Sequence, residues 1–200
     1  MKRGKRYLAS LALMIGLGTI VACGGTQLEG TNTPQFPSTV VESISTSKLK
    51  AAPDFEFTLY QGETELGVSK LSFSDLRGSK PIVLNFWAGL CPPCRAEMPD
   101  LQAFHDEFGD RVILLGVDIG RFTNLGSTED AKRLLDESNV IYPAGYPTDG
   151  KAAIEYEILG MPTTVFVTAD GKIFRKWTGA LNKDVLTRIS NEMLQAQGTP

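Results

Sequence analysis

The sequence predicts a three-layer α/β domain in which helices cover both faces of a mixed central sheet. Two nearly continuous apolar runs, residues 81–87 and 111–118, are typical of central strands that are buried on both faces. Helical patterns follow these runs at 92–108 and 128–138. Because strands alternate with helices while the last two strands flank a turn at 169–171, we expect a sheet that combines both kinds of strand pairing.

The N-terminal part of the domain is expected to add a β-hairpin to this sheet. Alternating apolar residues over 55–60 predict a strand, residues 61–63 predict a turn, and the residues after the turn predict a partner strand. A short helical turn closed by glycine is expected over 74–78. The first central strand, 81–87, then enters the core.

Caps and breakers define the helices. The helix over 92–108 ends at Gly109, and the next helix has Ser127 or Thr128 as its N-cap and two carboxylates in its first turn. The remaining predicted elements are the hairpin strands 163–167 and 172–177 and a closing helix over 184–194.

The N-terminus predicts export from the cytoplasm. Four basic residues precede an uncharged stretch over 7–22, a pattern typical of an export signal. The stretch is shorter than the roughly 20 apolar residues that span a bilayer comfortably. Residues 20–24 resemble the bacterial lipobox, which implies that Cys23 is lipidated and anchors the chain to the outer face of the membrane. An uncleaved signal anchor and ordinary cleavage are alternatives, and both also place the domain outside the cytoplasm.

The sequence divides into a signal peptide over 1–22, a flexible tether over 23–50 and one domain over 51–197. The tether is rich in Gly, Thr, Ser and Pro without apolar periodicity, so it cannot bury enough surface to offset its ordering entropy. Loss of the signal peptide removes four positive charges and changes the formal net charge from −3 to −7. An acidic body disfavours a nucleic-acid partner.

The stretch "NFWAGLCPPCRAEMP", residues 85–99, carries two cysteines at the junction of a strand and a helix. Of the three cysteines in the chain, assigning Cys23 to lipid leaves Cys91 and Cys94 as a pair. The free N–H groups and the dipole at a helix N-terminus favour the thiolate of Cys91, which is the nucleophile in disulfide exchange. Cys94, one helical turn on, can reach back to Cys91, so the pair favours thiol–disulfide exchange.

A metal site and a structural staple are the competing interpretations of this pair. A structural zinc site needs four protein ligands and a catalytic site usually three, whereas this chain offers two thiols besides Cys23 and a single histidine, His105. We expect His105 to be an exposed helix residue and therefore expect no metal, with a copper carrier as the alternative. A bond across so few residues constrains the unfolded chain little, which disfavours a staple.

Two segments, "IVLNFWAGLCPPCRAEMP" and "GMPTTVFVTADGKI", resemble the membrane-anchored TlpA/ResA-type thiol–disulfide oxidoreductases of the thioredoxin superfamily. The AhpC/TSA–Redoxin group shares their extended fold. The segments "APDFEFTLY", "LSFSDLRGSKPIVLNFWA" and "YPTDGKAAIEYEILGMPTT" also resemble this branch, so the similarity covers about 51–195. It implies a thioredoxin-like sandwich whose dithiol works without a cofactor.

The resemblance implies a role for several residues. Cys91 would be an exposed nucleophile and Cys94 a buried resolving thiol. Pro162, after Met161, matches the family's cis-proline, whose neighbouring backbone binds the substrate chain. Glu97 matches a glutamate that tunes the thiol pKa values or relays a proton; a solvated helix glutamate is the alternative.

Three further positions concern the surroundings of the pair. Trp87 keeps an aromatic position of the family, where we expect it to pack beside the site and count it with the substrate-binding residues. Asn85 replaces the buried aspartate of cytoplasmic thioredoxins and cannot accept a proton, which leaves Glu97 as the better acceptor. Leu90 replaces the tryptophan that most relatives carry before the first cysteine, which changes the surface offered to a partner.

The sequence therefore favours a lipid-anchored thiol–disulfide oxidoreductase that acts on exported proteins. The resemblance implies the reductive direction, for example on apocytochrome c, with electrons supplied by a transmembrane reductase of the CcdA/DsbD kind. One alternative is a peroxiredoxin-type thiol peroxidase, although residues 84–90 lack the Pro-x-x-x-Thr/Ser pattern that such enzymes place before their cysteine. The other alternative is a non-enzymatic, metal-binding lipoprotein.

Overall fold

A computed structural model describes residues 49–198 of the chain, so the expected signal peptide, Cys23 and the tether up to residue 48 lie outside the described residues. The strands are β1 (Glu56–Gln61), β2 (Lys70–Ser72), β3 (Ile82–Trp87), β4 (Ile113–Asp118), β5 (Ala144–Pro147), β6 (Thr163–Val167) and β7 (Ile173–Thr178). The helices are α1 (Glu63–Leu66), α2 (Pro92–Phe108), α3 (Gly120–Thr123), α4 (Thr128–Glu137), α5 (Lys151–Glu155) and α6 (Lys183–Ala196), with a 3-10 turn, η2, at Phe73–Leu76.

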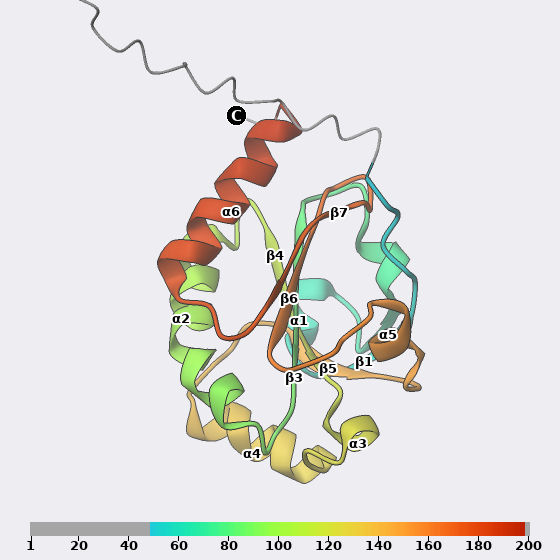
Figure 1. The fold of residues 1–200 in the computed structure, drawn as a ribbon, viewed down its shortest axis with the longest axis vertical. Coiled ribbons are helices and arrows are strands. Elements are labelled where there is room, and N and C mark those ends of the chain that lie inside the picture. Colours follow the sequence, from blue (N-terminus) through green and yellow to red (C-terminus); the bar gives the residue numbers. More distant parts are fainter. Residues whose placement is uncertain (1–48, 199–200) are drawn as a thin grey trace, which may run out of the picture. The chain divides into compact units, whose positions relative to one another are not determined.

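The seven strands form one mixed sheet in the order β2-β1-β5-β4-β3-β6-β7 (Figure 1). The central pairs β3–β4 and β4–β5 are parallel, while β1–β2, β1–β5, β3–β6 and β6–β7 are antiparallel. Every residue of β3 and β4 is buried, as their nearly continuous apolar runs predicted. The mixed sheet expected from the sequence is confirmed.

Each face of the sheet packs on its own hydrophobic cluster. On one face α2, α4 and α6 contribute Leu101, Leu134 and Ile189, and Figure 1 shows α2 and α6 running side by side there. On the other face η2 and α5 contribute Phe73 and Ala152. The layered architecture follows from β3, which sends alternate side chains into the two clusters and so requires cover on both sides.

The structure differs from the sequence-based expectation in several short elements. β1 and β2 do form the expected antiparallel hairpin, but the connection between them contains α1, which begins after Gly62 and ends at Gly67, both with positive φ. β5, α3 and α5 were not predicted from the sequence. β5 reads Ala-Gly-Tyr-Pro, and Gly and Pro are depleted in strands, so only its pairing with β1 and β4 reveals it. Among the described helices, none has both the length and the apolar character needed to cross a membrane.

Gly145 of β5 provides a test of this sheet order. A Cβ atom at this position would lie 2.1 Å from the carbonyl oxygen of Thr58 and 2.7 Å from the Cα of Leu59, both on β1. Because the clash is with backbone, we expect Gly145→Ala to lower the free energy of unfolding by about 3 kcal/mol in urea denaturation. Gly67→Ala is the control: its Cβ would meet nothing within 4 Å, and only the positive φ would cost about 1 kcal/mol. Equal losses in the two variants would contradict the β1–β5 register.

Candidate active site

The two cysteines of the CPPC segment form a disulfide at the point where β3 gives way to α2. The sulfur atoms are 2.09 Å apart and the Cα atoms 5.2 Å apart. Cys91 is the N-cap residue of α2, and its Sγ accepts a hydrogen bond from the backbone N–H of Cys94 at 3.3 Å. Pro92 occupies the first helical position, where its missing N–H leaves no hydrogen bond unmade. A sulfur held at this place faces the positive end of the helix, which favours a thiolate when the bond is reduced.

One expectation about this pair requires correction. Cys94 is fully buried as expected, but Cys91 is only 4% exposed, so the expected exposed nucleophile is wrong for the disulfide form. The burial has a structural reason, since the Cys91 sulfur is bonded to a buried partner and turned toward the first turn of α2. The neighbouring Leu90 is the exposed side chain of this segment, at 55%.

The loop before Cys91 is fixed by close backbone contacts. The Leu90 N–H donates to the carbonyl of Leu125 at 2.8 Å. A Cβ atom on Gly89 would lie 2.5 Å from the backbone nitrogen of Ala131 in α4, so only glycine allows this approach. The loop therefore holds the dithiol against the start of α4.

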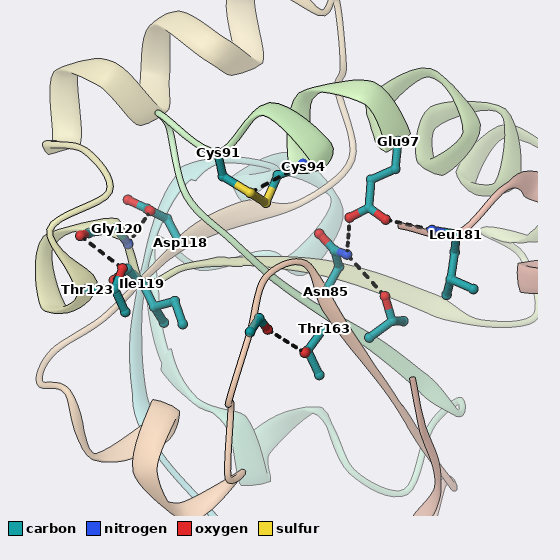
Figure 2. Close-up of a disulfide and its surroundings, with 12 residues drawn as sticks. Asn85, Cys91, Cys94, Glu97, Asp118, Ile119, Gly120, Thr123, Thr163 and Leu181 are labelled. Carbon is teal, nitrogen blue, oxygen red and sulfur yellow. Dashed lines mark hydrogen bonds between the residues drawn. A yellow bond between two sulfur atoms is a disulfide. The ribbon is translucent and has the colours of Figure 1, made fainter. Parts of the chain in front are cut away.

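Glu97 lies one turn of α2 beyond Cys94, and the structure decides between its two expected environments. The residue is 1% exposed, which excludes the solvated alternative. Its Oε1 accepts a hydrogen bond from Asn85 Nδ2 at 2.8 Å, and its Oε2 accepts one from the Leu181 N–H at 3.0 Å. Asn85 also donates to Thr164 Oγ1 at 3.1 Å. Figure 2 shows this chain of contacts running from Glu97 to Asn85 on the Cys94 side of the disulfide.

Burial changes the acidity of Glu97. Loss of solvation raises its pKa from the usual 4.5 to about 7, opposed by the hydrogen bonds from Leu181 and Asn85 and assisted by the charge of Asp100. A carboxyl group with this pKa takes up and releases a proton near neutral pH. Asn85 takes part by orienting this carboxyl group, consistent with the expectation that Glu97 is the better proton acceptor of the two.

The proline expected to be cis is so in the structure. The Met161–Pro162 peptide bond is cis, and Met161 is half-buried against both hydrophobic clusters. β6 begins directly after it and pairs Thr163 with Phe86 near the end of β3, so this bond lies at the same edge of the sheet as the dithiol. The Gly179 N–H already donates to the Pro162 carbonyl, at 2.8 Å.

Two further expectations are corrected by burial. Trp87 is fully buried and packs in the same hydrophobic cluster as Cys91 and Cys94. It therefore offers no surface to a substrate. The side chain of His105 is 13% exposed, and its Nε2 lies 3.6 Å from Glu65 Oε2, so it is not an exposed residue. Across residues 49–198, no three His, Cys, Asp or Glu side chains gather closely enough to hold a metal ion.

A second buried carboxylate near the pair was not predicted from the sequence. Asp118 ends β4 directly opposite Trp87 and is 1% exposed. Its Oδ2 accepts a hydrogen bond from the Tyr60 hydroxyl at 3.0 Å. An acidic residue at the carboxyl end of a buried strand was the available signal in the sequence.

Residues 49–176 match the family model described as the AhpC/TSA family. The chain belongs to the AhpC/TSA family. A curated relative of this AhpC/TSA protein is the thiol–disulfide oxidoreductase ResA of Oceanobacillus iheyensis, 35% identical over 147 residues, which are 74% of this chain and 73% of that protein. Another relative is the thioredoxin-like protein YneN of Bacillus subtilis, 32% identical over 66% of this chain and 72% of its own length. With a disulfide at the N-terminus of α2, this AhpC/TSA protein is a thiol–disulfide oxidoreductase of the ResA type.

Solved structures agree on the fold. The exposed lipoprotein thioredoxin of Streptococcus pneumoniae superposes with a TM-score of 0.58 and 26% identity, covering 70% of this chain and 99% of that one. A thiol:disulfide interchange protein DsbE from Chlorobium tepidum, described as putative, gives a TM-score of 0.60 at 24% identity over 74% of this chain and 96% of its own. The expected thioredoxin-like sandwich is thereby confirmed.

The raised pKa of Glu97 predicts a pH dependence of stability. Between pH 4.5 and 7 the folded protein binds a proton at Glu97 that the unfolded chain has released, so the free energy of unfolding falls as pH rises through this window. The full shift corresponds to about 3 kcal/mol. Glu97→Gln is expected to remove this share, measured by denaturation of the disulfide form at pH 4.5 and 7.5. The pKa of Asp118 is also raised by burial, so the Glu97→Gln variant should keep a smaller fall of the free energy of unfolding with rising pH. A variant that keeps the full wild-type slope would contradict the assignment.

Proposed function

We propose that this protein is a lipid-anchored oxidoreductase outside the cytoplasm that reduces disulfides in exported proteins. The observation that carries the proposal is the position of Cys91, whose sulfur caps α2 and receives the Cys94 N–H. The relatives support the class of reaction, since they are named thiol–disulfide oxidoreductases and interchange proteins. The export signal and the lipobox resemblance at Cys23 support the compartment.

The proposed reaction begins with the reduced dithiol. The Cys91 thiolate attacks one sulfur of a substrate disulfide, forms a mixed disulfide and releases the other substrate sulfur as a thiolate, which takes up a proton. Cys94 then loses its proton and attacks Cys91, which closes the Cys91–Cys94 bond and releases the second substrate sulfur. Two electrons have passed from the dithiol to the substrate, and the product is the disulfide form that the structure describes.

Glu97 is the proposed acceptor of the Cys94 proton. It follows Cys94 by three residues, so it shares a helix face with that thiol, and its pKa of about 7 suits a group that gains and loses a proton at neutral pH. Asn85 and the Leu181 N–H hold its two oxygens. In this proposal the backbone of Met161, next to the cis Pro162, binds the substrate chain beside the dithiol.

The proposed partners follow from the compartment and the direction. Apocytochrome c is a proposed substrate, because its cysteines must be reduced before haem is attached. A transmembrane thiol reductase of the CcdA/DsbD kind is proposed to return electrons to the Cys91–Cys94 disulfide. A lipid at Cys23 would hold the domain near such a reductase; one solved relative is itself named an exposed lipoprotein.

Single-cysteine variants test the order of the two thiols. Cys94→Ser is expected to accumulate mixed disulfides with substrate proteins, since the Cys91 attack proceeds and the release step is lost. Cys91→Ser is expected to reduce exchange by at least about a hundredfold and to trap almost nothing. Non-reducing gels of whole cells, with the Cys91→Ser/Cys94→Ser double variant as control, provide the measurement. Trapping by the Cys91→Ser variant alone would reverse the proposed roles.

Lipidation has its own test. When the full chain is expressed in cells fed a labelled fatty acid, we expect the label on the wild type and none on Cys23→Ser. The substitution leaves the dithiol unchanged, so the exchange activity of the two purified chains should be the same. Equal labelling of the two chains would exclude Cys23 as the anchor.

A further inference from the structure

Asp118 has no part in the exchange steps described above, yet it is placed with the residues that do. It pairs with Trp87 in the parallel β3–β4 register, so its side chain projects on the same face of the sheet as Trp87, toward α2 and the dithiol. Figure 2 shows Asp118 on the Cys91 side of the disulfide and Glu97 on the Cys94 side. Within residues 49–198, Glu97 and Asp118 are the buried carboxylates.

The contacts of Asp118 favour its charged form. Both oxygens accept hydrogen bonds, Oδ2 from the Tyr60 hydroxyl at 3.0 Å and Oδ1 from the Gly120 N–H at 2.8 Å. A Cβ atom on residue 120 would lie 3.0 Å from Asp118 Oδ1 and 3.3 Å from the Cβ of Ala88. Glycine, which has no Cβ, therefore lets this N–H approach Asp118 without crowding. Burial raises the pKa of Asp118, and the two donors oppose that rise.

Two cations, Arg121 and Lys132, lie around the Tyr60–Asp118 pair. Arg121 of α3 lowers the pKa of Asp118, but its guanidinium donates to the carbonyls of Pro147 and Thr148 at 2.8 and 3.1 Å. Lys132 of α4 lies 5.6 Å from the centre of the Tyr60 ring.

Two other carboxyl groups near the dithiol, Asp130 and Glu97, are bound by other residues. Asp130, in the first turn of α4 beside Gly89, accepts hydrogen bonds from the Ser127 N–H and from Arg133, and its pKa is lowered accordingly. Glu97 lies beyond Cys94 and is held by Asn85. Asp118 is therefore the buried carboxylate that flanks the proposed nucleophile.

We propose that Asp118, held by Tyr60 and Gly120, is a positioning residue for disulfide exchange whose negative charge disfavours the Cys91 thiolate. The inference rests on the proposed function, because it takes Cys91 as the nucleophile. The carboxylate opposes the helix N-terminus, which favours the thiolate. A dithiol whose thiolate is less stabilised gives up its electrons more readily, so Asp118 biases this site toward reduction of its substrates.

The test measures the Cys91 pKa directly in the full chain. In the Cys23→Ser/Cys94→Ser background one thiol remains, and its alkylation by iodoacetamide between pH 5 and 10 is followed by intact mass. We expect Asp118→Asn to move the midpoint of the rate profile down by about half a unit to one unit. Below both midpoints, alkylation should be about three- to tenfold faster in that variant.

Two control variants separate charge from structure. Asp110→Asn makes the same charge change at an exposed position just before β4 begins, at the end of the strand away from Asp118. It should leave the alkylation midpoint unchanged. Tyr60→Phe removes the hydroxyl but keeps the Asp118 charge, so its midpoint should stay near that of the parent. If Asp118 and Tyr60 acted only through the structure, Asp118→Asn and Tyr60→Phe would shift the alkylation midpoint equally. That result would overturn the proposal.

The remaining outcomes are also decisive. If Asp118→Asn does not fold, Asp118→Ser replaces it, because serine can still accept the Gly120 N–H, and the same downward shift is required. An unshifted midpoint in the folded variant overturns the inference and leaves the proposed function intact. Limited alkylation of the fully reduced wild type tests that function separately: modification of Cys94 before Cys91 would overturn the nucleophile assignment, and this inference with it.

Discussion

The whole site depends on the junction between β3 and α2. β3 is buried along its full length, so its carboxyl end is held in place by the sheet on both sides and by a cluster on each face. Four residues after Trp87, Cys91 caps α2, and the Cys94 N–H reaches the Cys91 sulfur. A rigid strand thus delivers a sulfur atom to the free N–H groups of a helix, where a thiolate is most easily formed.

The low polarity of the surroundings sets the electrostatics of the pair. Two carboxyl groups, Glu97 and Asp118, lie buried near the dithiol, each bound by two donors, and the pKa of each is raised by loss of solvation. Negative charge near a dithiol disfavours the thiolate and so opposes the effect of the helix N-terminus. In our account the strand–helix junction makes exchange possible, while Asp118 biases its direction and Glu97 accepts the Cys94 proton.

The sequence predicted the central elements well because their signals are local. The apolar runs of β3 and β4 and the limits of α2, from Pro92 to the residue before Gly109, need no tertiary information. The cysteine pair and the cis-proline were also evident, from spacing and resemblance. β5 was missed because its Gly and Pro are stabilised only by neighbouring strands.

The environment of the site residues was less accessible to sequence reasoning. The burial of Glu97 involves the Leu181 N–H, 84 residues away, and that of Asp118 involves Tyr60, 58 residues away. The burial of Cys91 in its disulfide form depends on its bond to Cys94, whose own burial comes from the packing of α2 in its cluster.

The most direct test of the central claim is the equilibrium reduction potential of the Cys91–Cys94 pair, titrated against glutathione and dithiothreitol couples. The reduction potential of thioredoxin is about −270 mV, and that of the strong oxidant DsbA is about −120 mV. Our account predicts a value toward that of thioredoxin, as suits a dithiol that donates electrons to exported proteins. A value toward that of DsbA would contradict it, because the protein would then introduce disulfides into its substrates.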